Sequence, residues 1–507
     1  MQGGVGILDF GSQYTQLIAR RLRELHIYCE IYAYDIAIEE LKKHQVKGLI
    51  FSGGPSSVYD AHSPKRSTVE LMKQWPVLGI CYGMQLMAHD LGGEVESHDQ
   101  KEYGFEEIKW LENSFLSGSQ KVWMSHGDSV KKAPPGFQVL AKSSSGHIAA
   151  MGKDKFLGLQ FHPEVAHTES GLKILEHFAK KICGIDTEWS PPLILQDILT
   201  KARKTVGSGE KVLCALSGGV DSTVVAVALT KALGKESVEC VFVDNGLLRK
   251  NEFEEVGEIY HSLGLNLHSL KAEDRFLSKL KGVIDPEQKR KIIGNTFIEI
   301  FEEFEKQQVN GLKWLAQGTL YPDVIESVSP RGTSVTIKTH HNVGGLPKNM
   351  KLKLIEPVRE LFKDEVRLIG KELGIPDKIL NRHPFPGPGL AVRILGDVTK
   401  ENLKILRACD KIFIDELQKN QLYGQIWQAF CVLLPVRTVG VQGDSRSYGQ
   451  VVSLRAVTSQ DGMTADWFPF EGAFLRKVSN RITNEVKEVN RVVYDITSKP
   501  PGTIEWE

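Results

Sequence analysis

Short apolar runs and amphipathic helical patterns alternate along most of this chain, in two separate series. The first series occupies residues 4–183 and the second begins near residue 190. Strands that alternate with helices form parallel sheets covered by those helices. The sequence therefore predicts an α/β fold with two doubly wound parallel-sheet domains. The predicted strands are 5–10, 27–34, 46–54 and 77–83 in the first series, and 211–217, 238–245, 265–272 and 313–319 in the second.

Two stretches interrupt the alternation and predict domain boundaries. Residues 184–192 have no apolar period and end in two prolines, which is typical of a linker. Residues 381–393 are rich in Pro and Gly, and β-rich segments with two helical patterns follow them, as in a small α+β domain. A chain of 507 residues has room for two to four domains. The predicted domains are residues 4–189, 190–382 and 383–507.

Composition narrows the cellular setting and the class of partner. Lys and Arg number 63 together, as do Asp and Glu, so the formal net charge is zero. This balance argues against the broad basic surface that nucleic-acid binding requires. No apolar run reaches the roughly 18 residues that cross a bilayer, and the first ten residues lack the basic stretch of a secretion signal. Seven scattered cysteines without a C-x-x-C pair are typical of the reducing cytosol. We therefore expect a cytoplasmic protein with no membrane or nucleic-acid partner.

One cysteine has neighbours that suggest chemistry. The segment GICYGMQ (79–85) places Cys81 between an apolar run and a helix start. Gly79 and Gly83 permit the sharp strand-to-helix turn of a nucleophile elbow. The dipole at a helix N-terminus stabilises a thiolate. Taken alone, Cys81 is more simply explained as a buried core thiol.

A second segment supplies the groups that a nucleophile needs. GLQFHPEV (158–165) contains His162 and Glu164, which share one face of an extended segment and so can converge on one site. A nucleophile needs a base, and the base needs an orienting group. The Gly-rich strand end FSGGP (51–55) offers backbone donors for an oxyanion. Together with Cys81, these features predict an acyl-transfer site.

The elbow followed much later by His-Pro-Glu resembles the class I glutamine amidotransferase domain. The resemblance implies that Cys81 is the nucleophile, His162 the general base and acid, and Glu164 the group that orients His162. It implies hydrolysis of glutamine to glutamate and ammonia through a γ-glutamyl thioester. Residues 123–130 resemble the segment that recognises the glutamine α-amino and carboxylate groups. The implied oxyanion and glutamine-binding residues are Gly53 and Tyr82, through their backbone amides, with Gly54, Gln85, His126, Gly127 and Asp128.

The segment SGGVDS (217–222) lies between an apolar run and a helical pattern in the second series. Its glycines let backbone N–H groups line a concave anion site at a helix N-terminus, and its serines add hydroxyl donors. Asp221 repels phosphates unless a cation lies between them, so Mg²⁺ is implied. For the motif in isolation, a Gly-rich turn capped by an aspartate is the simpler alternative.

In its full form this segment resembles the PP-loop of ATP pyrophosphatases. In that family the loop grips the β,γ-pyrophosphate of ATP while a substrate oxygen attacks the α-phosphorus, which gives an adenylylated substrate and pyrophosphate. A lysine from elsewhere can neutralise charge, either Lys363 or Lys338 on the loop-like stretch 327–350, which is predicted to be a lid. The neighbours His340 and His341 are not predicted to bind a metal, because adjacent side chains of an extended segment point apart. The implied ATP-binding residues are Ser217, Gly218, Gly219, Val220, Asp221, Ser222, Thr223 and Lys363, with Asp221 also at the metal.

An ammonia-releasing domain fused to an adenylylating domain implies amination, because AMP is a leaving group that ammonia can displace. Segments 382–393, 439–449 and 497–507, together with 288–297 and 316–327, resemble the GMP synthase family in the same order. That resemblance implies the conversion of XMP, ATP, glutamine and water to GMP, AMP, pyrophosphate and glutamate, a step of purine nucleotide biosynthesis. It also implies a homodimer formed through the C-terminal domain, which completes the XMP pocket. The implied XMP-binding residues are Arg290, Gln428, Asp444, Lys499 and Glu505.

Other functions use parts of the same chemistry. A tRNA-modifying enzyme adenylylates a uridine with such a loop, but the zero net charge and the glutaminase motif argue against it. Asparagine synthetases carry an N-terminal cysteine where this chain has Gln2, and NAD synthetases pair with a nitrilase-type glutaminase. A regulatory binder with inactive sites is disfavoured because the motif residues are intact. For Lys499 and Glu505, a solvated tail is the alternative to an XMP site.

Overall fold

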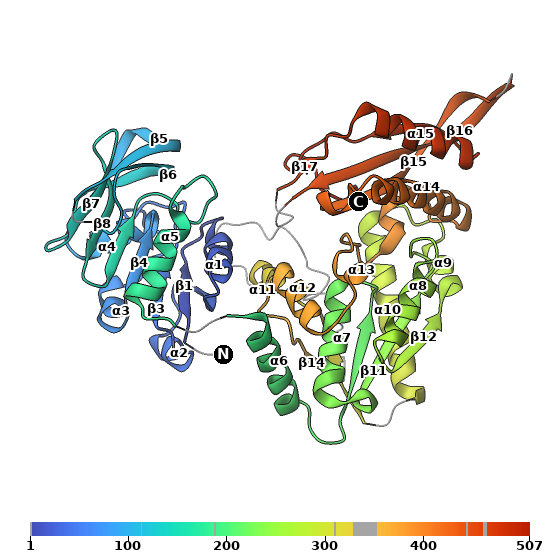
Figure 1. Cartoon of the computed structure of the whole chain (residues 1–507), viewed down its shortest axis with the longest axis horizontal. Helices are drawn as coiled ribbons and strands as arrows, with labels where there is room; N and C mark the ends of the chain where they lie inside the picture. Colours follow the sequence, from blue (N-terminus) through green and yellow to red (C-terminus); the bar gives the residue numbers. More distant parts are fainter. Residues whose placement is uncertain are drawn as a thin grey trace. The chain divides into compact units, whose positions relative to one another are not determined.

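The computed structural model describes residues 3–112, 114–186, 189–308, 311–327, 352–442, 445–459 and 464–507. The chain separates into two compact units, one formed by Met1–Ile194 and the other by the chain from Leu195 onward, apart from residues outside the described ranges. Each unit is built on an α/β sheet of its own, and a second, smaller sheet lies near the C-terminus (Figure 1). The predicted fold class is confirmed.

The first unit contains a nine-stranded sheet in the order β2-β1-β3-β4-β9-β8-β7-β5-β6. The five strands from β2 to β9 are parallel, as predicted, whereas β9, β8, β7, β5 and β6 pair antiparallel. The antiparallel strands follow one another without intervening helices, so the strand–helix alternation did not reveal them. The strands are β1 Val5–Asp9, β2 Cys29–Ala33, β3 Gly48–Phe51, β4 Val77–Ile80, β5 Glu94–Trp110, β6 Ser119–Lys132, β7 Gln138–Ser143, β8 Ile148–Lys153 and β9 Phe156–Leu159.

Helices cover the parallel part of this sheet, so its central strands are buried on both faces. Every residue of β3 and β4 is buried, which explains their continuous apolar sequence. The helix α1 buries Ile18 and Leu22 on one side and leaves Arg20 and Glu24 partly exposed on the other. The helices are α1 Thr15–Glu24, α2 Ile38–Lys43, α3 Thr68–Gln74, α4 Tyr82–Asp90 and α5 Gly171–Glu176, which a π-helical turn, His177–Ile182, continues.

The predicted linker at 184–192 is partly fixed in place. Trp189 is 3% exposed, and the guanidinium of Arg23 lies 4.2 Å from the centroid of its ring. The backbone N–H of Trp189 donates to the carbonyl of His26. The prolines that end the predicted linker, Pro191 and Pro192, begin a helix instead. A single aromatic side chain therefore anchors a stretch that has no apolar period.

The second unit begins with a five-stranded, fully parallel sheet in the order β12-β11-β10-β13-β14. All four predicted strands are present, and the long predicted helix 286–308 coincides with α10.

Of the helices described in either unit, none is long and apolar enough to cross a membrane. The strands are β10 Lys211–Leu216, β11 Val238–Asp244, β12 Leu267–Lys271, β13 Leu312–Ala316 and β14 Lys353–Ile355; the helices are α6 Pro191–Thr205, α7 Val220–Leu233, α8 Glu252–Ser262, α9 Glu273–Leu280, α10 Pro286–Gln308, α11 Tyr321–Ser327, α12 Lys363–Glu372 and α13 Asp377–Leu380, with a 3-10 turn at Lys235–Ser237.

The C-terminal part of this unit carries a four-stranded sheet and two long helices. Its strands β15 and β16 form a long antiparallel hairpin, and β18 joins β16 in parallel (Figure 1). This arrangement is the predicted small α+β part. Its elements are α14 Lys400–Lys419, β15 Gln428–Gln442, β16 Ser445–Thr458, β17 Asp466–Trp467, α15 Gly472–Glu485 and β18 Val489–Tyr494, with 3-10 turns at Gly389–Arg393 and Tyr423–Gln425.

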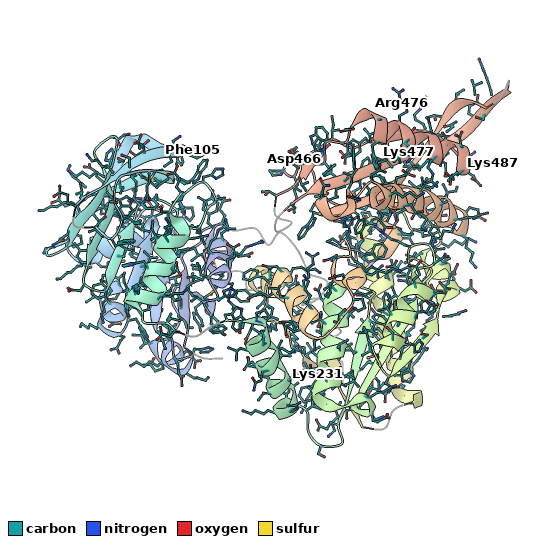
Figure 2. All side chains as sticks on the ribbon, viewed as in Figure 1. Phe105, Lys231, Asp466, Arg476, Lys477 and Lys487 are labelled. Carbon is teal, nitrogen blue, oxygen red and sulfur yellow. The ribbon has the colours of Figure 1, made fainter. Side chains whose placement is uncertain are left out.

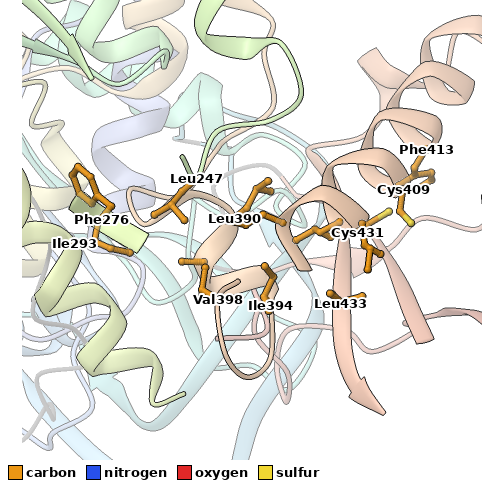
Figure 3. Close-up of a cluster of buried hydrophobic side chains, with 14 of the residues drawn as sticks. Leu247, Phe276, Ile293, Leu390, Ile394, Val398, Cys409, Phe413, Cys431 and Leu433 are labelled. Atoms are coloured by element: carbon orange, nitrogen blue, oxygen red, sulfur yellow. The ribbon is translucent and has the colours of Figure 1, made fainter. Parts of the chain in front are cut away.

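The Pro- and Gly-rich segment 381–393 does not interrupt the packing of the second unit. Leu390 is fully buried, and its backbone N–H donates to the carbonyl of Leu247 beyond β11. Figure 3 shows Leu247 and Phe276 in one buried cluster with Leu390 and with Cys431 of β15. One hydrophobic core therefore joins the parallel sheet to the C-terminal part, and the division between 382 and 383 stays a prediction. The predicted lid at 327–350 lies almost entirely outside the described residues.

Two candidate active sites

The chain bends sharply at Cys81, between β4 and α4. Cys81 has φ 51° and ψ −108°, a strained conformation that L-residues rarely adopt. Side chains on either flank are excluded by close contacts. A Cβ on Gly79 would lie 2.7 Å from the carbonyl carbon of Gly83, and a Cβ on Gly83 would lie 2.5 Å from the carbonyl oxygen of Phe51. The glycines of the elbow are thus steric requirements of the turn.

The predicted triad comes together at the carboxyl edge of the sheet. Cys81 follows β4 and His162 follows β9, and these two strands are parallel neighbours. The Nδ1 atom of His162 lies 2.7 Å from Oε1 of Glu164, whose side chain is fully buried. Gly53 completes the wall, because a Cβ there would lie 3.1 Å from Cε1 of His162 and 3.7 Å from Cβ of Cys81. The arrangement has the geometry of a nucleophile, a base and an orienting carboxylate.

The environment of His162 favours its charged form. Burial lowers the pKa of His162, but the charge of Glu164 and hydrogen bonds with Cys81 and Glu164 outweigh burial and raise that pKa well above its ordinary value. An imidazolium held next to the nucleophile can give its proton to a leaving nitrogen.

Neighbouring segments hold His162 in position. Its backbone N–H donates to the carbonyl of Trp123 on β6, and its carbonyl accepts from Oγ1 of Thr168 at 2.6 Å. The ring of Trp123 packs edge-on against Phe105, which is 62% exposed on β5 (Figure 2). The loop that carries the base is therefore tied to the β5–β6 hairpin.

The predicted glutamine-binding residues line the same region. Nε2 of Gln85 donates to the carbonyl of Asp128 at 2.6 Å. Nε2 of His126 lies 3.2 Å from Oε2 of Glu102, and the proximity of His126 is the main cause that lowers the pKa of Glu102 to about 2. Oδ2 of Asp128 is buried and has no hydrogen-bond partner among the described residues. An unpaired carboxylate oxygen is suited to an ammonium group.

Several side chains at this site were missed from the sequence. Glu102 faces His126 only through the antiparallel register of β5 and β6, which has no local signature. The ring of Tyr14 packs edge-on against His162 with centroids 5.0 Å apart. Nε2 of Gln160 lies 3.9 Å from Sγ of Cys81. Gln160 had a signal in the sequence, since it stands two positions before the base in a segment that was predicted to be extended.

The predicted phosphate loop follows β10 and opens α7. Gly218 has φ +78°, in the left-handed region that favours glycine, and Gly219 is the N-cap residue. The hydroxyls of Ser217 and Ser222 lie 3.1 Å apart across the turn. The side chain of Thr223 is buried, and its hydroxyl donates to the carbonyl of Gly219 at 2.7 Å, so the hydroxyl supports the loop from within. The loop lies at the N-terminus of α7, where anions are stabilised.

A lysine from a distant helix reaches this loop. Nζ of Lys363, the first residue of α12, lies 2.6 Å from Oδ2 of Asp221. The other oxygen of Asp221, Oδ1, is buried without a hydrogen-bond partner in the described part of the chain. Gly318 packs closely against Asp221, since a Cβ at residue 318 would lie 3.2 Å from Cβ of Asp221. The alternative lysine, Lys338, lies outside the described residues, as do His340 and His341.

A second cation at the loop was not predicted. Nη1 of Arg382 donates to the carbonyl of Gly218 at 2.7 Å, and its other terminal nitrogen pairs with Glu252 of α8. The segment that contains Arg382 was noted for its Pro and Gly content and for its family resemblance, but not as part of the phosphate site. No local spacing in the sequence connects it to a loop 164 positions earlier.

The donors at this loop fit a magnesium ion that is shared with a nucleotide. Among the residues that the structure describes, no three His, Cys, Asp or Glu side chains gather as a protein-only metal site. Mg²⁺ instead takes one or two carboxylates and fills its remaining positions with phosphate oxygens and water. Asp221, with one unpaired buried oxygen, is a suitable carboxylate.

Two of the predicted XMP-binding residues meet at the C-terminal tail. Oε1 of Glu505 accepts from Nε2 of Gln428 at 2.5 Å and from Nη2 of Arg393 at 2.8 Å. Arg393 is fully buried, and its guanidinium lies 4.1 Å from the ring centroid of Phe430. The tail is therefore bound to the rest of the unit and is not a solvated end.

A buried lysine fixes the tail beside another predicted XMP-binding residue. Nη2 of Arg290 donates to the carbonyl of Glu507 at 2.6 Å. The side chain of Lys289 is fully buried, and its Nζ lies 2.7 Å from Oε2 of Glu507. Of the other predicted XMP-binding residues, Lys499 pairs its backbone with that of Ala465. Asp444 lies outside the described residues.

Comparison with known proteins gives relatives over the full length. A protein named GMP synthase [glutamine-hydrolyzing] from Bdellovibrio bacteriovorus is 60% identical over 507 residues, which cover 99% of this chain and all of the relative. One of the same name from Helicobacter pylori is 55% identical, with 99% of each chain covered. The chain belongs to the glutamine-hydrolysing GMP synthase family.

Domain families match the parts of the chain that carry the two sites. The class I glutamine amidotransferase family matches residues 6–182, the NAD synthase family 194–296 and the C-terminal domain family of GMP synthase 415–506. A solved structure of a glutamine amidotransferase from Thermotoga maritima is 20% identical to this chain and covers 36% of it and 82% of its own length, with a TM-score of 0.27. The triad and the phosphate loop thus occur in one chain, in regions that match two different domain families.

Proposed function

We propose that this chain synthesises GMP from XMP, with glutamine as the nitrogen source and ATP as the activating nucleotide. One XMP, one ATP, one glutamine and one water give GMP, AMP, pyrophosphate and glutamate. The observation that carries the proposal is the presence, in one chain, of the Cys81–His162–Glu164 triad and a phosphate loop bearing Asp221 and Lys363. The triad releases ammonia, and the phosphate loop activates XMP, which accepts that ammonia.

Glutamine hydrolysis is assigned to the triad. The Cys81 thiol gives its proton to His162, and its Sγ attacks the δ-carbon of glutamine. The backbone amides of Gly53 and Tyr82 stabilise the oxyanion. The intermediate collapses with cleavage of the carbon–nitrogen bond, as His162 gives a proton to the nitrogen, which leaves as ammonia. A water molecule, deprotonated by His162, then attacks the γ-glutamyl thioester. Cleavage of the carbon–sulfur bond releases glutamate and regenerates the Cys81 thiol.

Recognition of glutamine is assigned to the groups around the elbow. The unpaired Oδ2 of Asp128 is suited to the α-ammonium group of the substrate. Gln85 supports this acceptor by donating to the Asp128 carbonyl. The pair of Glu102 and His126 lies beside them. Gly54 and Gly127 are assigned to the same site through the family resemblance alone.

Adenylylation is assigned to the phosphate loop. An oxygen of XMP attacks the α-phosphorus of ATP, and the bond to the pyrophosphate breaks. Backbone N–H groups of Gly218, Gly219 and Val220, with the hydroxyls of Ser217 and Ser222, hold the departing pyrophosphate. Ammonia then displaces AMP from the adenylylated base and leaves an amino group in its place. Thr223 shapes the loop through its bond to the Gly219 carbonyl.

We propose that Asp221 and the ATP phosphates together bind Mg²⁺. When bound, Mg²⁺ neutralises phosphate charge and stabilises the pyrophosphate leaving group. Lys363 holds the Asp221 carboxylate from the other side, and the unpaired Oδ1 remains available to the cation. Chelation of Mg²⁺ with EDTA is expected to stop pyrophosphate release but to leave alkylation of Cys81 unchanged.

XMP is assigned to the region where the tail meets the parallel-sheet part. Arg290 and Lys499 provide cations for the 5′-phosphate, and Gln428 and Glu505 provide hydrogen bonds for ribose or base. The contacts of Glu505 with Gln428 and of Glu507 with Arg290 support this grouping. Asp444 is assigned to the same pocket through the family resemblance alone.

We propose that the chain acts as a homodimer through its C-terminal part. On the β15–β16 hairpin, Val439, Val441 and Tyr448 are 49%, 74% and 68% exposed. Val439 and Tyr448 are cross-strand partners, so they form a continuous apolar strip. Val441→Asp is expected to convert the dimer to a monomer in sedimentation velocity, and an unchanged dimer would contradict this assignment. We place the enzyme in the cytoplasm, where its seven free thiols remain reduced.

Replacement of the nucleophile tests the proposed division of labour. Cys81→Ala is expected to lose glutamine-dependent GMP formation by at least about 1,000-fold and to keep the ammonia-dependent reaction. Cys183→Ala, at a half-buried thiol in the same unit, is the matched control and should keep both reactions. Loss of both reactions in a folded Cys81→Ala enzyme would contradict the proposal. So would the formation of ADP instead of AMP by the wild-type enzyme.

A further inference from the structure

One buried side chain at the triad has no role in the mechanism given above. Gln160 directly follows β9, and its backbone N–H donates to the carbonyl of Ala149. Its side chain is 1% exposed, like those of His162 and Glu164 at the next alternate positions. Residues 160 and 161 form bends after β9, so the direction of the Gln160 side chain is given by its contact with Cys81, with Nε2 3.9 Å from Sγ. Gln160 therefore faces the same site as the base and its orienting carboxylate.

The carboxamide of Gln160 contacts the reacting sulfur. Its Nε2 lies 3.9 Å from Sγ of Cys81, within reach of a hydrogen bond to sulfur. A thiolate is only an acceptor, so the amide nitrogen is the end of the carboxamide that must face it. The carbonyl of Ser125 lies 3.8 Å from the same sulfur and can accept from the neutral thiol. The sulfur thus has a partner in each of its protonation states.

The other end of the same carboxamide is unpaired. Oε1 of Gln160 is buried and has no hydrogen-bond partner among the described residues. A buried acceptor without a donor costs about 1–3 kcal/mol, so such atoms are rare unless a ligand pairs with them. A methionine of similar volume would fill the same space without leaving a buried acceptor unpaired, so space filling alone does not explain a glutamine at this position.

The substrate carries the missing donor. Attack by Cys81 requires the δ-carbon of glutamine to lie within roughly 3.5 Å of the sulfur. The carboxamide nitrogen of the substrate is bonded to that carbon and carries two hydrogens. It therefore lies beside the side chain that contacts the sulfur. The product glutamate has a carboxylate there, which offers no hydrogen and repels a carbonyl oxygen.

We propose that Gln160 is a specificity-determining residue for the amide nitrogen of glutamine. Its Nε2 holds the Cys81 sulfur, and its Oε1 accepts a hydrogen bond from the substrate nitrogen. The bond is kept as the nitrogen takes a proton from His162 and leaves as ammonia, and Gln160 itself neither gains nor loses a proton. The inference rests on the proposed role of Cys81 as the nucleophile.

Two variants separate the two ends of the carboxamide. Gln160→Met removes both the donor and the acceptor at similar volume, whereas Gln160→Glu keeps an acceptor and removes the donor. The readout is kcat/KM for glutamine divided by kcat/KM for L-glutamic acid γ-methyl ester, whose leaving oxygen has no hydrogen to donate. This ratio is expected to fall about tenfold in Gln160→Met, the loss of one hydrogen bond, and to stay within about threefold of wild type in Gln160→Glu.

A second readout reports on the donor. The rate of Cys81 alkylation by iodoacetamide at pH 7, followed by mass spectrometry, is expected to fall at least about threefold in both variants. Ammonia-dependent GMP formation, which is assigned to the phosphate loop, should match wild type in both variants. Gln138→Met, at an exposed glutamine on β7, should leave the ratio and the alkylation rate unchanged.

Failure of the inference can be told from failure of the proposed function. If Cys81→Ala still hydrolyses glutamine, both the proposed function and the role of Gln160 are contradicted. If Cys81→Ala is inactive with glutamine, an amide-to-ester ratio in Gln160→Met equal to wild type would overturn the inference alone. An equal loss of amide and ester hydrolysis would also overturn it, because it would show that Gln160 supports only the sulfur.

Discussion

Nζ of Lys363 lies 2.6 Å from Oδ2 of Asp221, although 142 positions separate the two residues in the chain. Asp221 belongs to the first turn of α7, and Lys363 begins α12. The phosphate loop, which has no lysine of its own, is thus served by a lysine from another helix. The pair is partly exposed at 28% and 24%, so we expect it to matter for ligand binding more than for stability.

Lys363→Met is expected to lower ammonia-dependent GMP formation at least about 100-fold, because a cation near the phosphates is lost. Glutamate release from glutamine in the first unit should continue. The matched control is Lys371→Met, at an exposed lysine on the same helix, which should retain GMP formation. Normal turnover in Lys363→Met, measured as AMP produced, would contradict the predicted ATP-binding role.

Glu164→Gln is expected to reduce kcat/KM for glutamine by about 100-fold. The charge of Glu164 raises the pKa of His162, so removing that charge lowers it and leaves less imidazolium at neutral pH. The alkaline limb of the pH–rate profile should therefore move to lower pH. Glu169→Gln, at an exposed carboxylate nearby, is the control. An unshifted profile would mean that Glu164 does not set the charge of His162.

His383 predicts a pH dependence of stability in the second unit. Both ring nitrogens are used: Nε2 donates to the carbonyl of Tyr423 at 2.9 Å, and Nδ1 accepts from the N–H of Ala429 at 3.2 Å. Burial lowers the pKa of His383 to about 4. In the unfolded chain a histidine takes a proton near pH 6.5, so stability is full above that pH and is lost as the pH falls toward 4. The loss by pH 5 is about 2 kcal/mol.

The measurement is the urea midpoint at pH 7.5 and pH 5. His383→Gln has no titrating ring, so its midpoint should fall less between these two pH values than that of the wild type. His261→Gln, at an exposed position on α8, should behave as wild type. An equal pH dependence in His383→Gln and wild type would show that His383 does not carry the effect.

Lys289→Met is expected to loosen the C-terminal tail. Nζ of Lys289 is fully buried among the carbonyls of Ala391 and Ile394 and the carboxylate of Glu507. Removing the cation leaves that carboxylate unpaired and should cost about 3 kcal/mol of stability. Because Glu505 belongs to the same tail, KM for XMP should rise at least about tenfold.

The neighbouring Lys291 provides the control for this prediction, since it is exposed on the same helix. Lys291→Met should leave both the melting temperature and KM for XMP near wild type. Destabilisation of Lys289→Met without any change in KM for XMP would separate the tail contact from XMP binding. That result would contradict the assignment of Glu505 to the pocket.

Local sequence was sufficient to predict the parallel strands of the two alternating series and the reactive groups that lie at strand ends. The elbow at Cys81 needs glycines two residues away on each side, which is a local steric demand that spacing reveals. His162 and Glu164 were predicted together because alternate residues of an extended segment share a face. The bounds of α10, Pro286–Gln308, followed from helical periodicity in the same way. In each case the physical cause acts over a few residues.

The sequence alone, however, did not determine which distant groups meet. The contact of Lys363 with Asp221, the pairing of Glu102 with His126 and the binding of Glu505 by Arg393 depend on strand order, register and core packing. The antiparallel extension of the first sheet was missed for the same reason, since pairing between strands leaves no local period. The chain thus specified its chemistry locally, and the tertiary structure decided which charges and hydrogen-bonding groups are close enough to act on one another.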